Sequence, residues 1–189
     1  MFAGMARAVP PFWERWEHGA THLEVGCGAG NALLSFAAEF PQLRVEGIEL
    51  NGAVLAETRR RDELLGVSDR VRLRQMDARE LDDVERFDSA QWSQLFFPEP
   101  TRADVLRALH RALRPGAPVV LPTLDEEAAD APGGAVRRLM VAGWGVPVRS
   151  RDELRAELED AGFEVLQQAP LPANAMTTSD GFALARRRP

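Results

Sequence analysis

The sequence has a single cysteine, Cys27, and only three histidines among its 189 residues: His18, His22 and His110. One cysteine excludes an internal disulfide, and the scattered histidines do not suggest a Cys/His nucleophilic pair. No apolar run approaches the ~20 residues that a membrane-spanning helix needs, and the first residues lack the apolar region and cleavage pattern of a signal peptide. We therefore expect a cytoplasmic protein with no membrane partner and no metal site.

Positive charge is also scarce. Lysine and arginine number 23 against 29 acidic residues, which gives a net charge of -6. Such a chain lacks the basic surface of a general nucleic-acid-binding protein, and we interpret the arginine clusters at 59–61 and 186–188 as a solvated helix face and a tail. We expect a small-molecule substrate, no nucleic acid, and a monomer or homodimer with a single sizeable core.

Two phosphate-binding motifs, G-x-x-x-x-G-K-[ST] and G-x-G-x-x-G, are missing. Instead, a short apolar strand ends at Val25 and leads into alternate glycines from Gly26 to Gly30, and apolar residues at helical spacing follow from Asn31. Glycines allow positive φ and a close approach of ligand to main chain, and free N–H groups at the helix start face that ligand. The stretch predicts an adenosine-containing cofactor; a plain strand-to-helix turn is the alternative.

An acid precedes these glycines, in the run Glu24-Val25-Gly26-Cys27-Gly28-Ala29-Gly30. The run resembles [DE]-x-G-x-G-x-G, the first motif of the class I S-adenosylmethionine-dependent methyltransferases. That cofactor carries an ammonium, a carboxylate and a sulfonium but no phosphate, so an acid beside the turn makes electrostatic sense. The resemblance covers nearly the whole chain from Thr21 onward, and it makes Cys27 a small residue under the cofactor rather than a nucleophile.

Two further acids end predicted strands. Glu49 closes the strand 43–50, where a carboxylate can accept both hydroxyls of a ribose; a solvated acid is the alternative. Asp77 and Ala78 follow the strand 71–76, where the resembled family contacts adenine, although Asp77 could equally be a helix N-cap. The resemblance implies S-adenosyl-L-methionine, with S-adenosyl-L-homocysteine as product, bound by Glu24, Gly26, Cys27, Gly28, Gly30, Glu49, Leu50, Asp77, Ala78, Trp92 and Ser93.

The fourth predicted strand, 87–94, begins with Phe-Asp as is common in the family, but its exit departs from [DNS]-P-P-[YFW], the signature of amino-group methylation on bases and glutamine. That departure puts a base-N-methylating role in doubt. The aromatic and apolar exit suits an uncharged or aromatic acceptor and the sulfonium, since a cation over an aromatic face gains ~0.5–2 kcal/mol. Ordinary core packing is the alternative for the proposed acceptor contacts, which are Phe12, Trp13, Phe96, Phe97, Met140 and Trp144.

No residue has the sequence context of a general base. Glu14, Glu99 and His110 are the titratable candidates if the acceptor is a hydroxyl or an amine, and His110 lies within a predicted helix, where a surface role is the stronger interpretation. We expect catalysis by positioning. A loss of turnover above ~1000-fold on replacing one of the three would identify it as a base.

The remaining elements complete an α/β fold. Helices are predicted over 53–65, over 101–113 with Thr101 as N-cap, and over 151–161 with Ser150 and Glu153 as a capping box. The last two strands, 163–168 and 181–186, have no helix between them and should pair antiparallel. We predict a Rossmann-like, seven-stranded, mostly parallel sheet with an antiparallel last strand and helices on both faces.

The predicted organisation is a helical leader over residues 1–20, either packed on the sheet or acting as a lid, and a methyltransferase domain over 21–189. The predicted function is in-line transfer of a methyl group from S-adenosylmethionine to a small, aromatic or apolar acceptor. Two alternatives stay open: a nicotinamide-dependent oxidoreductase on a related sheet, and a non-catalytic, cofactor-binding partner subunit that kept the fold.

Overall fold

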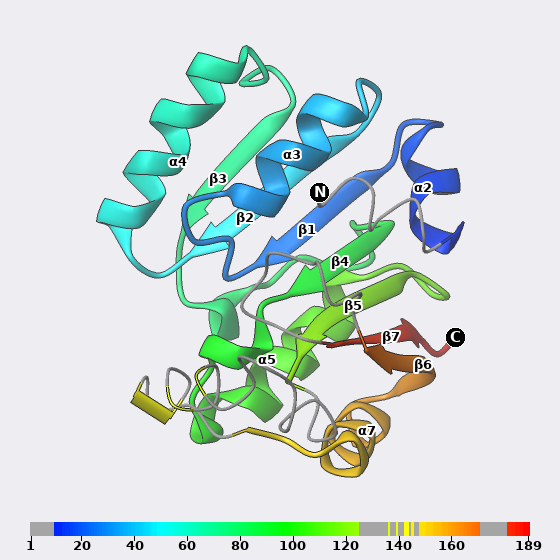
Figure 1. The fold of residues 1–189 in the computed structure, drawn as a ribbon. Coiled ribbons are helices and arrows are strands. Elements are labelled where there is room, and N and C mark those ends of the chain that lie inside the picture. The colour runs from blue at the N-terminus through cyan, green and yellow to red at the C-terminus, as the bar shows by residue number, and fades with distance from the viewer. Residues whose placement is uncertain are drawn as a thin grey trace.

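The computed structural model describes residues 10–124, 148–170 and 181–189, together with positions 136, 139, 142, 143 and 145. One seven-stranded sheet runs through it in the order β3-β2-β1-β4-β5-β7-β6 (Figure 1). The strands are β1 Thr21–Val25, β2 Arg44–Glu49, β3 Val71–Gln75, β4 Ser89–Trp92, β5 Pro118–Thr123, β6 Phe163–Pro170 and β7 Gly181–Arg187. The helices are α2 Pro10–Trp16, α3 Asn31–Glu39, α4 Gly52–Leu65, α5 Glu99–Ala112 and α7 Arg151–Asp160, with 3-10 turns η1 Ala78–Glu80 and η2 Gln94–Phe96.

The pairing of the strands confirms the predicted fold class. Strands β1 to β5 run parallel, and β7 runs antiparallel to both β5 and β6. The chain moves outward from β1 to β3 and then returns to place β4 on the other side of β1. This reversal of direction is a topological switch point, where loops diverge and leave room for a ligand at the carboxyl ends of the strands.

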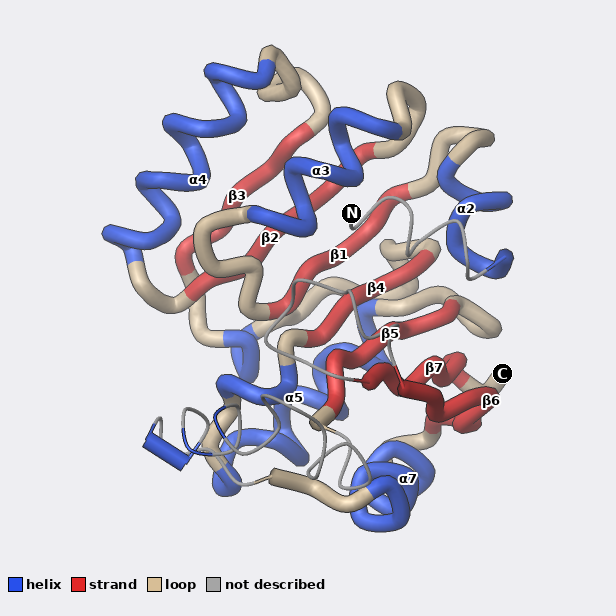
Figure 2. Tube along the Cα trace, in the orientation of Figure 1, coloured by secondary structure: helices blue, strands red, loops and turns tan. Residues whose placement is uncertain are grey.

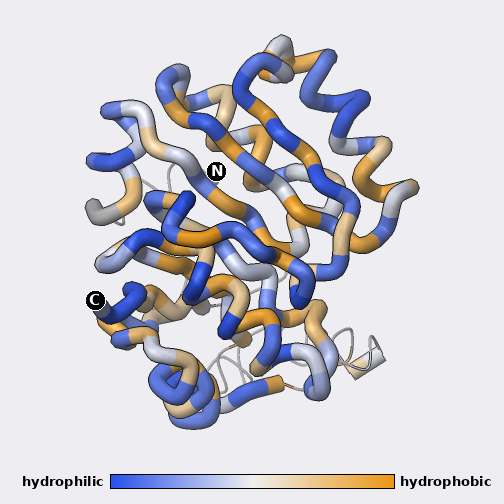
Figure 3. The backbone as a smooth tube through the Cα atoms, turned by 180° about the vertical axis from the view of Figure 1, so that it is seen from behind, coloured by the Kyte–Doolittle hydropathy of each residue, from blue (hydrophilic) through white to orange (hydrophobic). Residues whose placement is uncertain are grey.

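Helices cover both faces of the sheet, as Figure 2 shows, and each face has its own apolar core. Leu23 and Val25 of β1 point toward α5 and α7, while His22 and Glu24 point toward α3, because successive side chains on a strand alternate. Each fully buried aliphatic or aromatic side chain contributes about 1.5–3 kcal/mol. Seen from behind, hydrophilic and hydrophobic residues alternate along the strands (Figure 3).

A charged cluster covers part of the face toward α5. Only the short turn η1 follows β3 there, and the buried Glu46 of β2 binds Arg74 at 2.9 Å and Arg86 at 2.5 Å. Asp83 binds the same two guanidinium groups, at 2.5 and 2.6 Å. The cluster therefore shields the edge of the sheet with paired charges instead of an apolar helix face.

One predicted helix cap is confirmed and one is wrong. Ser150 and Glu153 form the reciprocal capping box at the start of α7. Helix α5, however, begins at Glu99 with Pro98 as its N-cap, and the Thr101 hydroxyl donates to the Pro98 carbonyl at 2.7 Å. The reason lies in Pro100, which presets a helical φ in the first turn and moves the start of the helix toward the N-terminus.

Candidate functional site

A cavity of about 1010 Å³ lies at the carboxyl ends of β1, β2, β4 and β5. The predicted cofactor residues that line it are Glu24, Gly26, Cys27, Gly28, Glu49, Leu50, Asp77, Ala78 and Ser93. Two of the predicted acceptor residues, Phe96 and Phe97, also line it. These residues come from four separate stretches of the chain, and the structure brings them together at one cavity.

The glycine turn at the cavity is held by backbone geometry that other residues cannot adopt cheaply. Gly26, Gly28 and Gly30 have φ of 75°, 54° and 74°. The N–H groups of Gly26 and Cys27 both donate to the Ile48 carbonyl, at 2.9 and 3.1 Å, which fastens the turn to β2. A Cβ on Gly26 would lie 2.9 Å from the Phe97 ring, so this glycine keeps the turn close to the cavity wall.

Gly30 does not line the cavity, contrary to the prediction of a cofactor contact. It is the left-handed N-cap of α3, and a Cβ there would lie 2.5 Å from Thr58 Cγ2. Gly30→Ala should therefore cost about 2–3 kcal/mol of unfolding free energy, from a strained φ and a clash together. Urea denaturation measures this loss.

Gly28→Ala is the matched control, because its φ is also positive but nothing lies within 4 Å of the added Cβ. We expect this control to lose only about 1 kcal/mol. Equal losses in the two variants would show that contact with α4 does not matter at Gly30.

Glu24 places a buried carboxyl with a raised pKa at the wall of the cavity. The side chain is buried, Oε1 lies 3.4 Å from Gln91 Nε2, and Oε2 has no hydrogen-bond partner among the described residues. Burial raises the pKa of this carboxyl to about 8, opposed only in part by the nearby Leu33 N–H. A buried carboxyl with an unused oxygen fits a ligand that brings a cation, such as the ammonium group of an amino acid.

Glu49 joins the glycine turn to the start of α4. Its Oε2 accepts from the Gly28 N–H at 3.0 Å, and its Oε1 accepts from the Asn51 N–H at 2.9 Å. Both oxygens lie on the cavity side of β2 and keep lone pairs that these bonds do not use. A contact to ribose hydroxyls stays a prediction.

Asp77 caps η1, which confirms the N-cap interpretation. Its Oδ1 accepts from the Arg79 N–H at 2.9 Å, and the Arg79 guanidinium binds Oδ2 at 2.7 Å. These hydrogen bonds from Arg79 lower the pKa of Asp77. Because Asp77 and Ala78 also line the cavity, the capping role leaves the predicted adenine contact open.

The opposite end of the cavity is apolar. We call it the apolar end, and its residues are Leu95, Phe96, Phe97, Val120, Pro122 and Phe182. Phe97 packs edge-on against Trp92 with ring centroids 5.6 Å apart, while Phe96 is about half exposed at the rim. The ionisable side chains that line the cavity, within the described ranges, come from β1, β2 and β3 and the turns that follow them: Glu24, Cys27, Glu49, Asp77 and Arg79.

Trp92 is not a cavity residue, contrary to the prediction. It is fully buried on the α5 face, with the Arg102 guanidinium 4.8 Å from its ring. Strand alternation explains the error, because Trp92 and Ala90 point toward α5 while Gln91 points toward the cavity. Gln91 was missed, and the alternation along β4 was the signal that could have found it.

The three candidate bases do not line the cavity. Glu14 lies exposed on α2, and Glu99 pairs with Arg149 at the start of α5. His110 packs against the Phe163 ring, 5.3 Å between centroids, at the far end of α5, where burial lowers its pKa. The structure therefore does not bring these three side chains together at the cavity, and a role as general base stays a prediction.

Phe12 and Trp13 of the N-terminal leader, which are predicted to contact the acceptor, also do not line the cavity. Phe12 is buried against Trp16, 5.4 Å between ring centroids, in the core beside α3, and Trp13 packs against the same core. Trp16 is tied to the sheet by a 2.9 Å hydrogen bond from its Nε1 to Ser89 Oγ. The described part of the leader therefore packs onto the sheet; Met140 and Trp144 lie outside the described residues.

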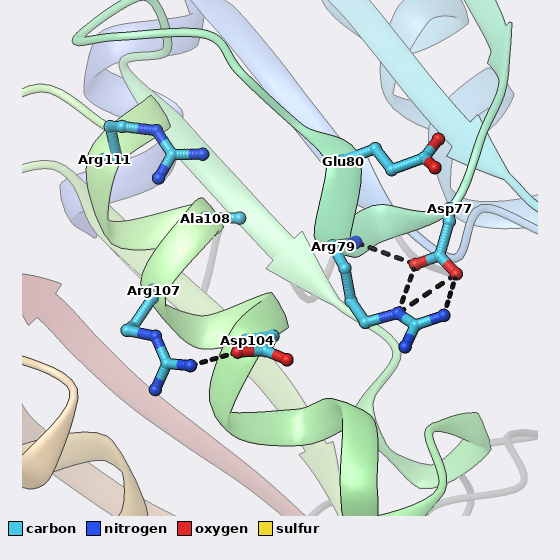
Figure 4. Close-up of a pocket in the computed structure, with 7 residues that line it drawn as sticks. All are labelled: Asp77, Arg79, Glu80, Asp104, Arg107, Ala108 and Arg111. Atoms are coloured by element: carbon cyan, nitrogen blue, oxygen red, sulfur yellow. Dashed lines mark hydrogen bonds and ion pairs between the residues drawn. The ribbon is translucent and has the colours of Figure 1, made fainter.

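A second hollow of about 420 Å³ lies between η1 and α5 (Figure 4). Three acids among its lining residues balance its three arginines. Each guanidinium is already engaged: Arg79 with Asp77, Arg107 with Asp104, and Arg111 with the Leu81 carbonyl. This arrangement leaves no evident anion-binding group. Within the described residues, no cluster of His, Cys, Asp or Glu could hold a metal ion, and no helix has the length and apolarity to cross a membrane.

The strand order and the glycine turn after β1 define a Rossmann-like domain with a cavity at the carboxyl ends of its strands. A family model described as "Methyltransferase domain" matches residues 23–116, which hold the turn and the strand-end acids. The chain belongs to the class I S-adenosylmethionine-dependent methyltransferases.

Two curated relatives support this assignment. The chain is 32% identical over 169 residues to a phosphatidylethanolamine N-methyltransferase of Cereibacter sphaeroides, covering 85% of this chain and 78% of that protein. It is 32% identical over 172 residues to a ubiquinone biosynthesis O-methyltransferase of Pseudomonas paraeruginosa, covering 84% and 71%. These relatives share the family and differ in the atom methylated.

The fold also matches a solved structure of geranyl diphosphate C-methyltransferase from Streptomyces coelicolor, crystallised with Mg²⁺, geranyl diphosphate and S-adenosyl-L-homocysteine. The TM-score is 0.74 at 15% identity, over 98% of this chain and 80% of that one. At that identity the likeness concerns the fold alone.

Proposed function

We propose that this protein transfers the methyl group of S-adenosyl-L-methionine to a small apolar or aromatic acceptor. The observation that carries the proposal is Glu24, a buried carboxyl that borders the cavity and has one oxygen with no hydrogen-bond partner in the described part of the chain. Such a group is costly in an empty site and favourable beside a cation. The ammonium of the cofactor supplies that cation.

The cavity offers a matching contact for three parts of the cofactor: its ammonium, its ribose and its adenine. Glu24 would bind the ammonium, Glu49 the ribose hydroxyls, and Asp77 with Ala78 the adenine, while Leu50 offers an exposed apolar side chain at the rim. When bound, the cofactor supplies a methyl carbon activated by its positively charged sulfur. The side chains of this protein then have to orient the acceptor and keep water out.

The apolar end supports an acceptor with an aromatic or aliphatic surface. Its side chains provide contact area but no ionisable group within the described ranges, so they favour uncharged compounds over anions. Catalysis then depends on holding the acceptor atom in line with the transferred group, which alone can supply about 7–11 kcal/mol of the barrier reduction. The two curated relatives act on a phospholipid amine and in ubiquinone biosynthesis, according to their names, which is compatible with an apolar acceptor.

Calorimetric titration with S-adenosyl-L-homocysteine, S-adenosyl-L-methionine and NAD tests the cofactor. We expect heat with the first two ligands and none with NAD; the reverse result would favour the oxidoreductase alternative. Transfer of a labelled methyl group to a panel of phenols, quinols, amines and lipids then tests turnover. Tight cofactor binding with no transfer to any member would support the non-catalytic alternative.

A further inference from the structure

Helix α4 contacts the outer side of the glycine turn through two side chains. Thr58 Oγ1 donates to the Gly28 carbonyl at 2.8 Å, and Arg61 Nη1 donates to the Ala29 carbonyl at 2.6 Å. Arg61 Nη1 also donates to Asn31 Oδ1 at 2.6 Å, at the first residue of α3. The turn is thus held from a helix that follows it by more than twenty residues.

These contacts correct the interpretation of the arginines at 59–61 as a purely solvated face. Arg60 does face solvent, where it pairs with Glu57 at 2.7 Å and both side chains are well exposed. Arg61 instead reaches across to the turn. Two adjacent arginines on one helix therefore have different surroundings, which provides a matched pair for experiment.

The contacts of α4 form one continuous face. Val54 lines the cavity, and Thr58 and Arg61 follow at spacings of four and three residues, so all three lie on the same side of the helix. The helix is itself anchored at its start, where Glu49 accepts from the Asn51 N–H. The Thr58 methyl group also lies against Gly30.

We propose that Thr58 and Arg61 are positioning residues for the cofactor. In a planar trans peptide the C=O and the following N–H point in opposite directions. Holding the Gly28 carbonyl toward α4 therefore directs the Ala29 N–H away from that helix, and Ala29 lines the cavity. This inference rests on the proposed function, because it has these side chains support the turn at which the proposed cofactor would bind.

The physical need for such a support follows from the turn itself. Its three glycines give the turn many accessible conformations, so holding the turn in a single conformation is entropically costly. If the support is lost, a smaller fraction of molecules has the binding conformation, and the apparent dissociation constant rises in proportion. The transfer step at saturating cofactor is not affected, because neither side chain lines the cavity.

The test compares Arg61→Gln with Arg60→Gln. We expect Arg61→Gln to weaken S-adenosyl-L-homocysteine binding about tenfold, the usual size of a lost charge-assisted hydrogen bond, and to raise the KM for S-adenosyl-L-methionine with little change in kcat. Arg61→Lys should recover part of the affinity, since an ammonium can still reach the Ala29 carbonyl. Arg60→Gln should match the wild type.

Hydrogen exchange in the ligand-free protein gives a second, independent readout. The peptide spanning 26–31 should exchange faster in Arg61→Gln and in Thr58→Val than in Arg60→Gln. Equal exchange and equal affinity in the two arginine variants would overturn the inference, as would a fall in kcat with KM unchanged. If the wild type binds neither cofactor form, the proposed function fails, while the exchange rates still decide whether α4 holds the turn.

Discussion

Replacing Glu24 by glutamine should weaken the binding of S-adenosyl-L-homocysteine by about 10- to 100-fold at pH 8. The variant keeps the shape of the side chain and removes the charge that would pair with the ligand's ammonium, and a hydrogen bond between charged groups contributes about 1.5–3 kcal/mol. Calorimetric titration measures the loss. An unchanged dissociation constant would remove the main support for the proposed cofactor.

The substitution Glu24→Gln should also abolish the pH dependence of the affinity for S-adenosyl-L-homocysteine. The pKa of Glu24 is about 8 in the ligand-free protein, because burial disfavours the charged form. Below pH 8 the carboxyl is protonated and must release a proton to pair with the ammonium, so affinity should fall about tenfold per unit as the pH drops toward 6. Among the described residues, the groups that face Glu24 are the Gln91 amide, the Leu33 N–H and the Cys27 thiol, with Glu49 nearby, and none of these supplies a positive charge.

Proton release can be counted directly by titrating at pH 7 in two buffers of different ionisation enthalpy. We expect about one proton per ligand in the wild type and none in Glu24→Gln. Affinity that is flat between pH 6 and 8, with no proton released, would contradict the assigned role.

Glu24 should also influence stability in a defined pH window. Its folded pKa of about 8 exceeds the ordinary value of 4.5, so the folded state binds more protons and becomes less stable as the pH rises from 4.5 to 8. His22 acts oppositely: burial lowers its pKa from 6.5 to about 3, so stability is lost as the pH falls through that range. The difference between wild type and Glu24→Gln isolates the carboxyl, because both retain His22.

Local sequence patterns were sufficient for the architecture and for most of the residues that line the cavity, while their contacts to a cofactor stay predictions. The glycine turn, the strand-end acids and the two final strands can each be recognised within a few residues of the sequence. Pattern also located the capping box of Ser150 and Glu153, whose two partners are only three residues apart. A local signal was not always sufficient, because Pro100 moves the start of α5 to Glu99 and makes the predicted Thr101 cap wrong.

The expectations that were wrong depend on long-range packing. Trp92 is predicted to contact the cofactor because of its place at the exit of the fourth strand, but the alternation of side chains along β4 directs it to the opposite face of the sheet. Arg61 looked solvated because its partner, the Ala29 carbonyl, lies 32 positions away in the sequence. Phe12 was compatible with either a lid or a core residue, and the choice depended on its contacts with Trp16 and His22. Periodicity does not carry such information.

The role of Arg102 could likewise not be predicted from the sequence, because its partner Glu157 is distant in the chain. Replacement of Arg102 by alanine should cost about 3–5 kcal/mol of unfolding free energy. The side chain is buried, and its guanidinium binds both oxygens of Glu157 on α7, at 2.7 and 2.6 Å. It also donates to the Gln94 carbonyl at 2.8 Å and lies over the Trp92 ring. Alanine would leave the Glu157 carboxylate without its guanidinium partner and the Gln94 carbonyl with only the Phe97 N–H, beneath the wall of the cavity.

Urea denaturation of three variants separates this effect from simple loss of charge. Arg107→Ala, on the same helix, removes an exposed pair with Asp104 and should cost less than about 1 kcal/mol. Arg102→Met combined with Glu157→Leu should recover much of the stability lost in Arg102→Ala, because an apolar pair replaces both charges. If Arg102→Ala cost no more than Arg107→Ala, the buried pair would not hold α5 and α7 together, and the wall formed by η2 would need another support.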